Sequence, residues 1–197
     1  MSPTNGAGWL DALARAGAAH DEEARDAALS AIAHTERVDI YWSTLIGHLA
    51  TAAVGADMPP ADALINVVGI LAAMEIPAYA PASNSCKGDR LQREDTLKAC
   101  RGVASAFENG NNVITEMLGV AIAKRVWPEG SEEWRAAVER RRTYEYRADA
   151  WKPLEPVTMS SPQAQAYIAL CLEYSREQDS MRRQLIDAGK DPDPPKN

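Results

Sequence analysis

The spacing of apolar residues constrains this chain more than any other feature of its sequence. In most segments they recur at intervals that bring them onto one face of an α-helix, and Pro, Gly and Asn separate one segment from the next. Ala dominates the apolar residues, and runs of Val, Ile and Thr are few, which favours helices over strands. We predict about eight helices, over residues 9–19, 21–34, 39–54, 61–75, 92–108, 113–127, 131–151 and 161–188.

Short connections between these helices predict an all-α fold of antiparallel helical hairpins, arranged as an irregular bundle or a short array. The hairpins would start at unequal intervals, so a strict repeat protein is not expected. A chain of 197 residues is long enough for a real hydrophobic core. We predict one domain over residues 1–190 and a disordered, Pro-rich tail over residues 191–197.

The helix over residues 39–54 is expected to have one inward face, and the helix over residues 61–75 is expected to be central. In the first, Tyr41/Trp42, Leu45/Ile46 and Leu49 are expected to face inward, and the second is apolar on most sides. Its apolar stretch is interrupted by Asn66 and is too short to cross a bilayer, so we expect no membrane span. No signal peptide is visible, and a lipid anchor would require that a signal segment had been removed.

The net charge of −7 is concentrated in the first part of the chain, where residues 1–76 carry ten acids and three bases. This balance argues against a nucleic-acid-binding protein, which needs a basic stripe, and permits a basic protein partner. Many of the acids also stand where helices should begin, so that they complement the helix dipole, and we favour this simpler interpretation. The basic, aromatic stretch over residues 139–151 contains acids among its arginines and is expected to pack structurally.

The chain carries none of the sequence motifs of nucleotide-binding or covalent catalytic sites. His20, His34 and His48 are too far apart to form a typical zinc site, which places two ligands within a few residues. We therefore predict no catalytic residue, no metal and no cofactor. One candidate carboxylate cluster is Glu36 and Asp39 near His34, although a polar loop does little to separate the pKa values of two carboxyls.

Cys86 and Cys100 stand at the two ends of the stretch CKGDRLQREDTLKAC, and Cys86 lies in the one long predicted loop, residues 77–90. A zinc site would need further ligands nearby, and a reactive thiol would need a neighbouring histidine or helix N-terminus. We favour a Cys86–Cys100 disulfide, with Cys171 as a buried single thiol. The bond would indicate the periplasm or cell envelope, whereas free thiols would indicate the cytoplasm.

This cysteine pair, followed by RVWPEGSEEW at residues 125–134, resembles poorly characterised all-helical proteins of Gram-negative bacteria. Such proteins are often exported, sometimes as lipoproteins. The resemblance implies an envelope location and no enzymatic activity.

Our leading hypothesis is a non-catalytic helical protein that binds another protein, and its most concrete version is an immunity-type inhibitor of a basic secreted effector. The partner-binding residues expected under this hypothesis are acids of the first three helices, Asp21, Glu22, Asp26 and Asp39. The alternative is a carboxylate-dependent hydrolase with a cleft between hairpins. A third option, a ligand- or lipid-binding bundle, would require an apolar cavity.

Overall fold

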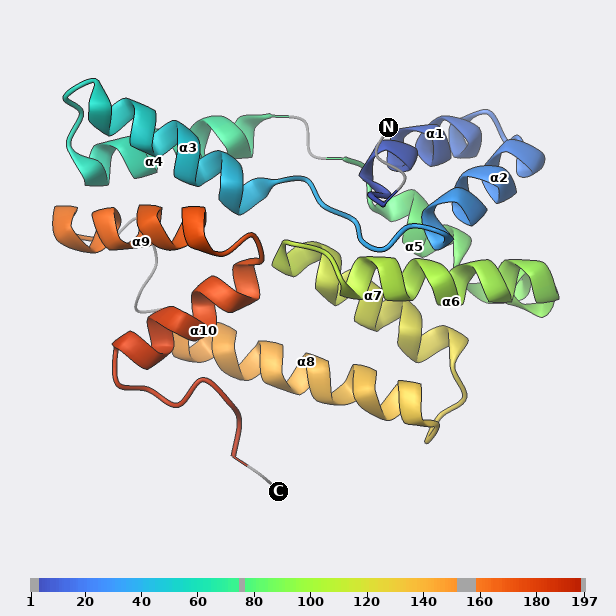
Figure 1. Cartoon of the computed structure of the whole chain (residues 1–197). Helices are drawn as coiled ribbons and strands as arrows, with labels where there is room; N and C mark the ends of the chain where they lie inside the picture. The colour runs from blue at the N-terminus through green and yellow to red at the C-terminus, as the bar shows by residue number, and fades with distance from the viewer. Residues whose placement is uncertain (1–3, 75–76, 152–158, 196–197) are drawn as a thin grey trace. The chain divides into compact units, whose positions relative to one another are not determined.

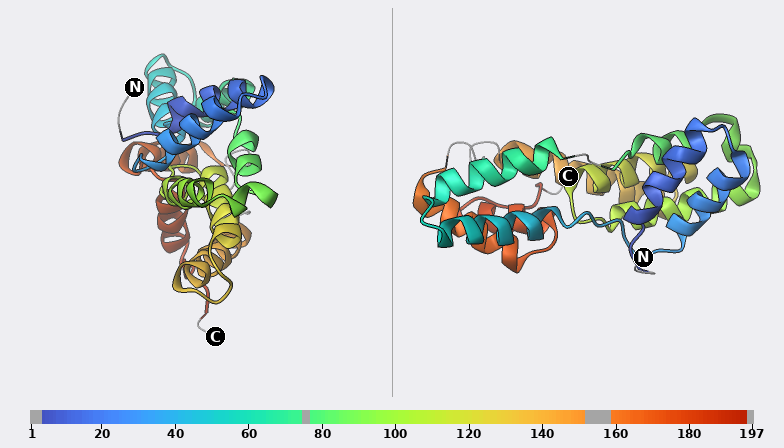
Figure 2. Two further views of the ribbon diagram at one scale, coloured as in Figure 1. Left: turned by 90° about the vertical axis from the view of Figure 1, so that its right-hand side faces the viewer. Right: turned by 90° about the horizontal axis from the view of Figure 1, so that it is seen from above.

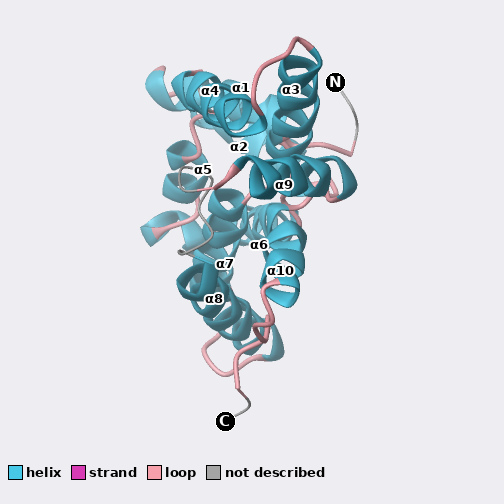
Figure 3. Ribbon diagram, turned by 90° about the vertical axis from the view of Figure 1, so that its left-hand side faces the viewer, coloured by secondary structure: helices cyan, strands magenta, loops and turns pink. Residues whose placement is uncertain are grey.

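The computed structural model describes residues 4–74, 77–151 and 159–195, and its regular elements are helices (Figures 1 and 3). They are α1 (Ala7–Ala18), α2 (Glu22–Ala33), α3 (Trp42–Gly55), α4 (Pro60–Ala73), α5 (Ala80–Ser85), the 3₁₀ helix η1 (Gly88–Gln92), α6 (Glu94–Glu108), α7 (Val113–Val126), α8 (Glu132–Trp151), α9 (Ser161–Glu173) and α10 (Glu177–Asp187). The described residues contain no β-strand, so the all-α prediction is confirmed.

Contacts within the chain group it into two compact units. Unit 1 is Met1–Ile40 with Pro77–Arg141, and unit 2 is Tyr41–Ile76 with Arg142–Asn197. The prediction of one domain over residues 1–190, which concerns independent folding, stays a prediction. Residues 196–197 of the predicted tail lie outside the described residues.

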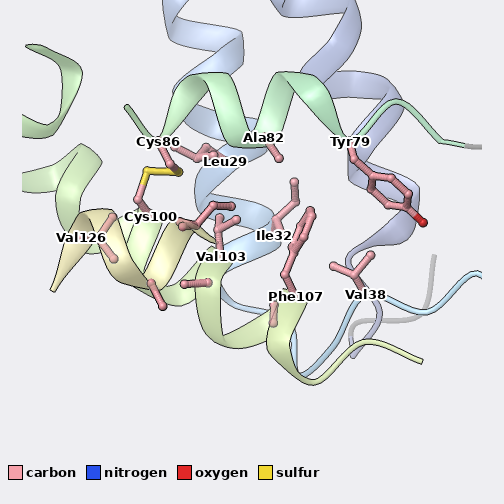
Figure 4. Packing of buried hydrophobic residues seen from close by; sticks show 14 of the residues in the cluster. Leu29, Ile32, Val38, Tyr79, Ala82, Cys86, Cys100, Val103, Phe107 and Val126 are labelled. Carbon is pink, nitrogen blue, oxygen red and sulfur yellow. A yellow bond between two sulfur atoms is a disulfide. The ribbon is translucent and has the colours of Figure 1, made fainter. Parts of the chain in front are cut away.

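Unit 1 is built around the antiparallel hairpin of α6 and α7, against which α2 and then α1 pack. Its core contains Leu10 and Leu13 of α1, Leu29 and Ile32 of α2, and Phe107 of α6 (Figure 4). Leu10, Leu13 and Phe107 recur at helical spacing on the amphipathic helices α1 and α6, which is why their burial could be predicted.

The Cys86–Cys100 disulfide is formed, and both cysteines are fully buried in the core of unit 1 (Figure 4). It joins the end of α5 to α6, across a Cα–Cα distance of 5.5 Å. The prediction of a continuous loop over residues 77–90 was wrong, because this stretch contains α5 and the start of η1. Ala82 and Ser85 are buried, so tertiary packing stabilises a helical turn that the Pro- and Ser-rich composition disfavours.

Unit 2 contains α3, α4 and α9, which pack against one another (Figure 2). Its core contains Ile46, Leu64, Leu71, Ile168 and Cys171. These residues come from all three helices, so the core of unit 2 depends on α9 returning to the α3–α4 hairpin.

The predicted helix over residues 161–188 is two helices, α9 and α10, separated by Tyr174–Arg176. Residues 173–180 contain no aliphatic side chain, so no continuous apolar face spans the two halves. Each half turns its own apolar residues inward, Ile168 and Cys171 in α9, and Met181 and Leu185 in α10.

We expect reduction of the Cys86–Cys100 disulfide to lower the free energy of unfolding by about 3 kcal/mol, because the bond closes a loop of about fifteen residues in the unfolded chain. Urea unfolding followed by circular dichroism, with and without reductant, measures the difference. The stability of the control variant Cys86→Ala/Cys100→Ala should not respond to reductant. Equal transition midpoints for the oxidised and reduced natural sequence would contradict the prediction.

Two glycines in helices should respond oppositely to substitution by Ala. A Cβ on Gly119 of α7 would overlap the main chain of Glu108 and lie 2.9 Å from Ala104 O, so Gly119→Ala should destabilise the protein by about 1–3 kcal/mol. A Cβ on Gly69 of α4 would meet no atom within 4 Å, so Gly69→Ala should stabilise it by up to about 1 kcal/mol. Thermal unfolding of both variants tests the contrast, which fails if they shift the melting temperature in the same direction.

Candidate protein-binding surface

Two of the predicted partner-binding acids have local structural roles. Asp21 is the N-cap of α2, where its carboxylate accepts a hydrogen bond from Ala24 N at 3.0 Å. Asp39 is buried, its carboxylate lies 3.6 Å from Arg37 Nε, and its main chain is hydrogen-bonded to the side chain of Asn5. Asp21 therefore caps a helix, and Asp39 is a buried residue of unit 1 whose charge lies near Arg37.

The other two predicted acids are brought together by arginines that sequence reasoning missed. Asp26 binds Arg90 Nη2 at 2.6 Å and Arg93 Nη2 at 2.7 Å, and Glu22 pairs with Arg90 as well. The arginines come from η1 and the start of α6, more than sixty residues along the chain, so no local signal could pair them with α2. Because both acids face cations of their own chain, their charge is largely compensated. Their role in partner binding stays a prediction.

A groove of about 540 Å³ runs between α2 and α6 beside this ion-pair cluster. Its lining mixes charged and polar side chains, among them Asp26, Lys98 and Thr96, with small residues such as Gly102. The hydroxyl of Thr96 is buried and makes no hydrogen bond to the described residues. This polar groove differs from the apolar cavity that a lipid-binding bundle requires.

The candidate hydrolase residues have separate environments. His34 is exposed at the end of α2, where its Nδ1 lies 2.6 Å from Ser30 O, whereas Glu36 is exposed and Asp39 is buried. Burial raises the pKa of the Glu108 carboxyl, and the nearby Arg140 opposes this. The Glu108 carboxylate binds Arg140 Nη1 at 2.7 Å, so the raised pKa reflects the burial of a carboxyl that already pairs with a cation.

No group of three His, Cys, Asp or Glu residues within the described ranges is placed to hold a metal ion. Cys171 is a buried single thiol, as predicted, and burial raises its pKa to about 12. A thiol with such a pKa remains protonated near neutral pH and is a poor nucleophile.

Most of the large apolar side chains that are exposed in the described part of the chain belong to α3, α4 and the residues next to these two helices. Residues 41–74 contain two acids, Asp57 and Asp62, and no Lys or Arg. We define the hairpin surface by its exposed large apolar side chains, Tyr41, Leu45, Leu49, Met58, Ile65, Ile70 and Met74, of which Tyr41 is 47% exposed and Ile70 is 61% exposed. Of the large hydrophobic residues exposed within the described ranges, Ile114 is the one that belongs to unit 1.

The hairpin surface corrects the predicted orientation of α3. Tyr41, Leu45 and Leu49 were expected to face inward with Ile46, but the buried side of α3 is formed by Ser43, Ile46, Gly47 and Ala50. Spacing could not identify the correct side, because α3 has no charged residue to mark which side faces water. The absence of Lys and Arg over residues 41–74 is the sequence feature that could have indicated exposed apolar side chains on this hairpin.

Both ends of α3 carry non-glycine residues in the left-handed backbone region. Tyr41 precedes the helix with φ of 58°, and Asp57 follows it with φ of 65°. A bulky residue in this region costs on the order of 1 kcal/mol and persists only where the surrounding structure determines it. At Tyr41 this conformation accompanies an aromatic ring that is half exposed at the edge of the hairpin surface.

No helix in the described ranges is long and apolar enough to cross a membrane. The hairpin surface also lacks the Lys and Arg residues with which amphipathic helices bind anionic lipid headgroups.

In comparisons with known proteins, no family model, no curated protein and no solved structure matches this chain. The predicted relationship to exported helical proteins of Gram-negative bacteria therefore stays a prediction.

The ion-pair cluster should contribute to stability. Asp26→Lys would place a third cation beside Arg90 and Arg93, and we expect it to lower the free energy of unfolding by about 1–3 kcal/mol. Glu23→Lys, at an exposed position in the same helix, makes the same charge change and should cost less than about 1 kcal/mol. Thermal unfolding compares the two variants. Equal decreases in the free energy of unfolding for the two variants would show that the stability of α2 depends on its net charge alone.

Proposed function

We propose that this chain is a non-catalytic protein that binds another protein through the hairpin surface. The observation that carries the proposal is a set of exposed, large apolar side chains on a hairpin whose residues 41–74 contain two acids and no Lys or Arg. Scattered exposed apolar residues are ordinary, but a concentration of them on one helical hairpin without Lys or Arg is typical of an interaction site. The cores of protein interfaces are likewise depleted in charge.

Gly69 supports close approach of a partner to α4. It lies on the exposed side of the helix, and the space where a Cβ would stand is open. A glycine inside a helix costs up to about 1 kcal/mol relative to Ala. Among the described residues, no atom lies close enough to Gly69 to require a glycine there. A helix or loop of a partner that docks across Gly69, Ala72 and Ala73 would fill the open space beside this glycine.

The charge around the hairpin surface suggests the chemistry of the partner. Asp57 and Asp62 are exposed beside it, and the whole chain carries −7. A partner with an apolar contact area and basic residues at its rim would be attracted over a distance and would then bury the aliphatic side chains. An immunity-type inhibitor of a basic secreted effector is the specific form of this proposal.

We propose the periplasm or cell envelope as the place of action. The supporting observation is the buried Cys86–Cys100 disulfide, because such bonds persist in oxidising compartments. A carboxylate-dependent hydrolase has no comparable support, since the shifted carboxyl Glu108 pairs with a cation instead of a second acid.

The double variant Leu45→Glu/Ile70→Glu should abolish partner binding without unfolding the protein, because both side chains are exposed and the acids would be desolvated in the complex. Wild-type and variant proteins are immobilised and exposed to an envelope extract, and each captured protein is purified and its affinity measured by calorimetry. We expect the variant to bind at least about a hundredfold more weakly.

The matched control is Ile114→Glu, an equally exposed aliphatic residue in unit 1. It should bind the purified partner like the wild type. Sedimentation equilibrium of each protein alone tests whether a second copy occupies the hairpin surface instead. A partner that binds the double variant and the wild type equally would contradict the proposal.

A further inference from the structure

The C-terminal residues fold back onto α8 within unit 2 (Figure 1). α10 ends in a turn at Gly189, whose φ of 70° lies in the left-handed region, and Lys190 N donates a hydrogen bond to Leu185 O at 2.8 Å. This is the Schellman geometry that glycine favours after a helix. Beyond it, Lys190 Nζ donates to Ala150 O at 2.7 Å, near the end of α8.

Three side chains of α8 donate hydrogen bonds to main-chain carbonyl groups of the returning segment. Tyr146 Oη donates to Asp191 O at 3.2 Å, Arg147 Nε donates to Pro192 O at 2.9 Å, and the Arg142 guanidinium donates to Pro195 O. Proline has no amide hydrogen, so its carbonyl oxygen is its one main-chain hydrogen-bonding group. Tyrosine and arginine donors on α8 thus match the main chain of a proline-containing segment.

One carboxylate of the segment is also recognised. Asp193 Oδ1 lies 2.8 Å from Arg147 Nη2, and its Oδ2 lies 3.8 Å from Arg182 of α10. The Arg147 side chain is only 13% exposed and is oriented by a 3.3 Å hydrogen bond to the buried Gln178. A mostly buried arginine held in this way forms a prepared site for a carboxylate.

We propose that these side chains form a binding site for an extended, acidic, proline-containing segment of another protein, and that the chain's own tail occupies this site in the absence of that protein. The site, here called the α8 tail site, consists of Arg142, Tyr146, Arg147, Gln178 and Arg182. Its contacts reach carbonyl oxygens and one carboxylate, which any segment of the pattern Asp-Pro-Asp-Pro can supply. Nothing in these contacts requires that the ligand belong to the same chain.

The attachment of the tail determines how strongly an external segment must compete. A tethered ligand acts at an effective concentration on the order of millimolar, so the tail mostly occupies the site when its dissociation constant is well below that concentration. If the tail is bound about nine-tenths of the time, the apparent affinity for an external segment falls about tenfold. Release of the tail should therefore uncover a site that already exists. The proposal does not depend on the hairpin surface.

The test uses the full chain and a fluorescent peptide with the sequence of residues 189–195, GKDPDPP. In the variant Asp193→Arg, the tail carries a cation toward Arg147 and Arg182 and should leave the site. We expect the peptide, measured by fluorescence anisotropy, to bind this variant about tenfold or more tightly than the wild type. Adding Arg147→Ala to the variant should remove this binding.

The matched control is Asp187→Arg, which makes the same charge change at an acid that pairs with Arg183 within α10. It should behave like the wild type. The milder variant Asp193→Asn provides a second release of the tail if Asp193→Arg is poorly folded by circular dichroism. A folded, tail-released variant that fails to bind the peptide would overturn the binding site. Equal peptide affinity for the wild type and released variants would overturn its occupation by the tail.

Discussion

Unit 1 depends on the attachment of one irregular stretch, residues 77–93, to the helices beneath it. Cys86 is bonded to Cys100 in the middle of the core, and Arg90 and Arg93 hold the end of the same stretch to Asp26 of α2. Without these links, a segment rich in Pro, Ser and Asn would have little apolar surface with which to compensate its conformational entropy. The disulfide and ion pairs therefore complete a core that α1, α2, α6 and α7 supply with apolar side chains.

The sequence was sufficient for those parts of the fold whose helices are amphipathic. The seven predicted helices up to residue 151 agree with the observed ones to within three residues, and Phe107 and Cys100 lie on the buried side of α6 as expected. Prediction failed where apolar and charged residues do not mark opposite sides of a helix. α3 has no charged residue to mark its outer side, so its inward face is determined by packing against α4 and α9. The break between α9 and α10 has neither Pro nor Gly to mark it.

For the candidate surfaces, too, the sequence predicts the local features but not the contacts between residues far apart in the chain. Asp21, Glu22, Asp26 and Asp39 were recognisable as an acidic group, but their cation partners and burial depend on tertiary structure. The hairpin surface had a compositional signal in residues 41–74, while the side chains that contact the tail had been interpreted as packing residues of a basic helix. Ion pairs within each unit hold several of the charged side chains, whereas the exposed apolar side chains of α3 and α4 belong to a stretch, residues 41–74, without Lys or Arg.

The order of the cysteines along the chain has a consequence for biogenesis. Both partners of the disulfide precede Cys171 by more than seventy residues. When such a chain is translocated N-terminus first into an oxidising compartment, Cys86 and Cys100 emerge together while Cys171 is still on the other side of the membrane. At that stage a single pairing exists, so the native bond forms without competition from the third thiol and without the help of an isomerase. Once Cys171 has followed, α9 can bury it, and a buried thiol is protected from disulfide exchange and covalent dimerisation.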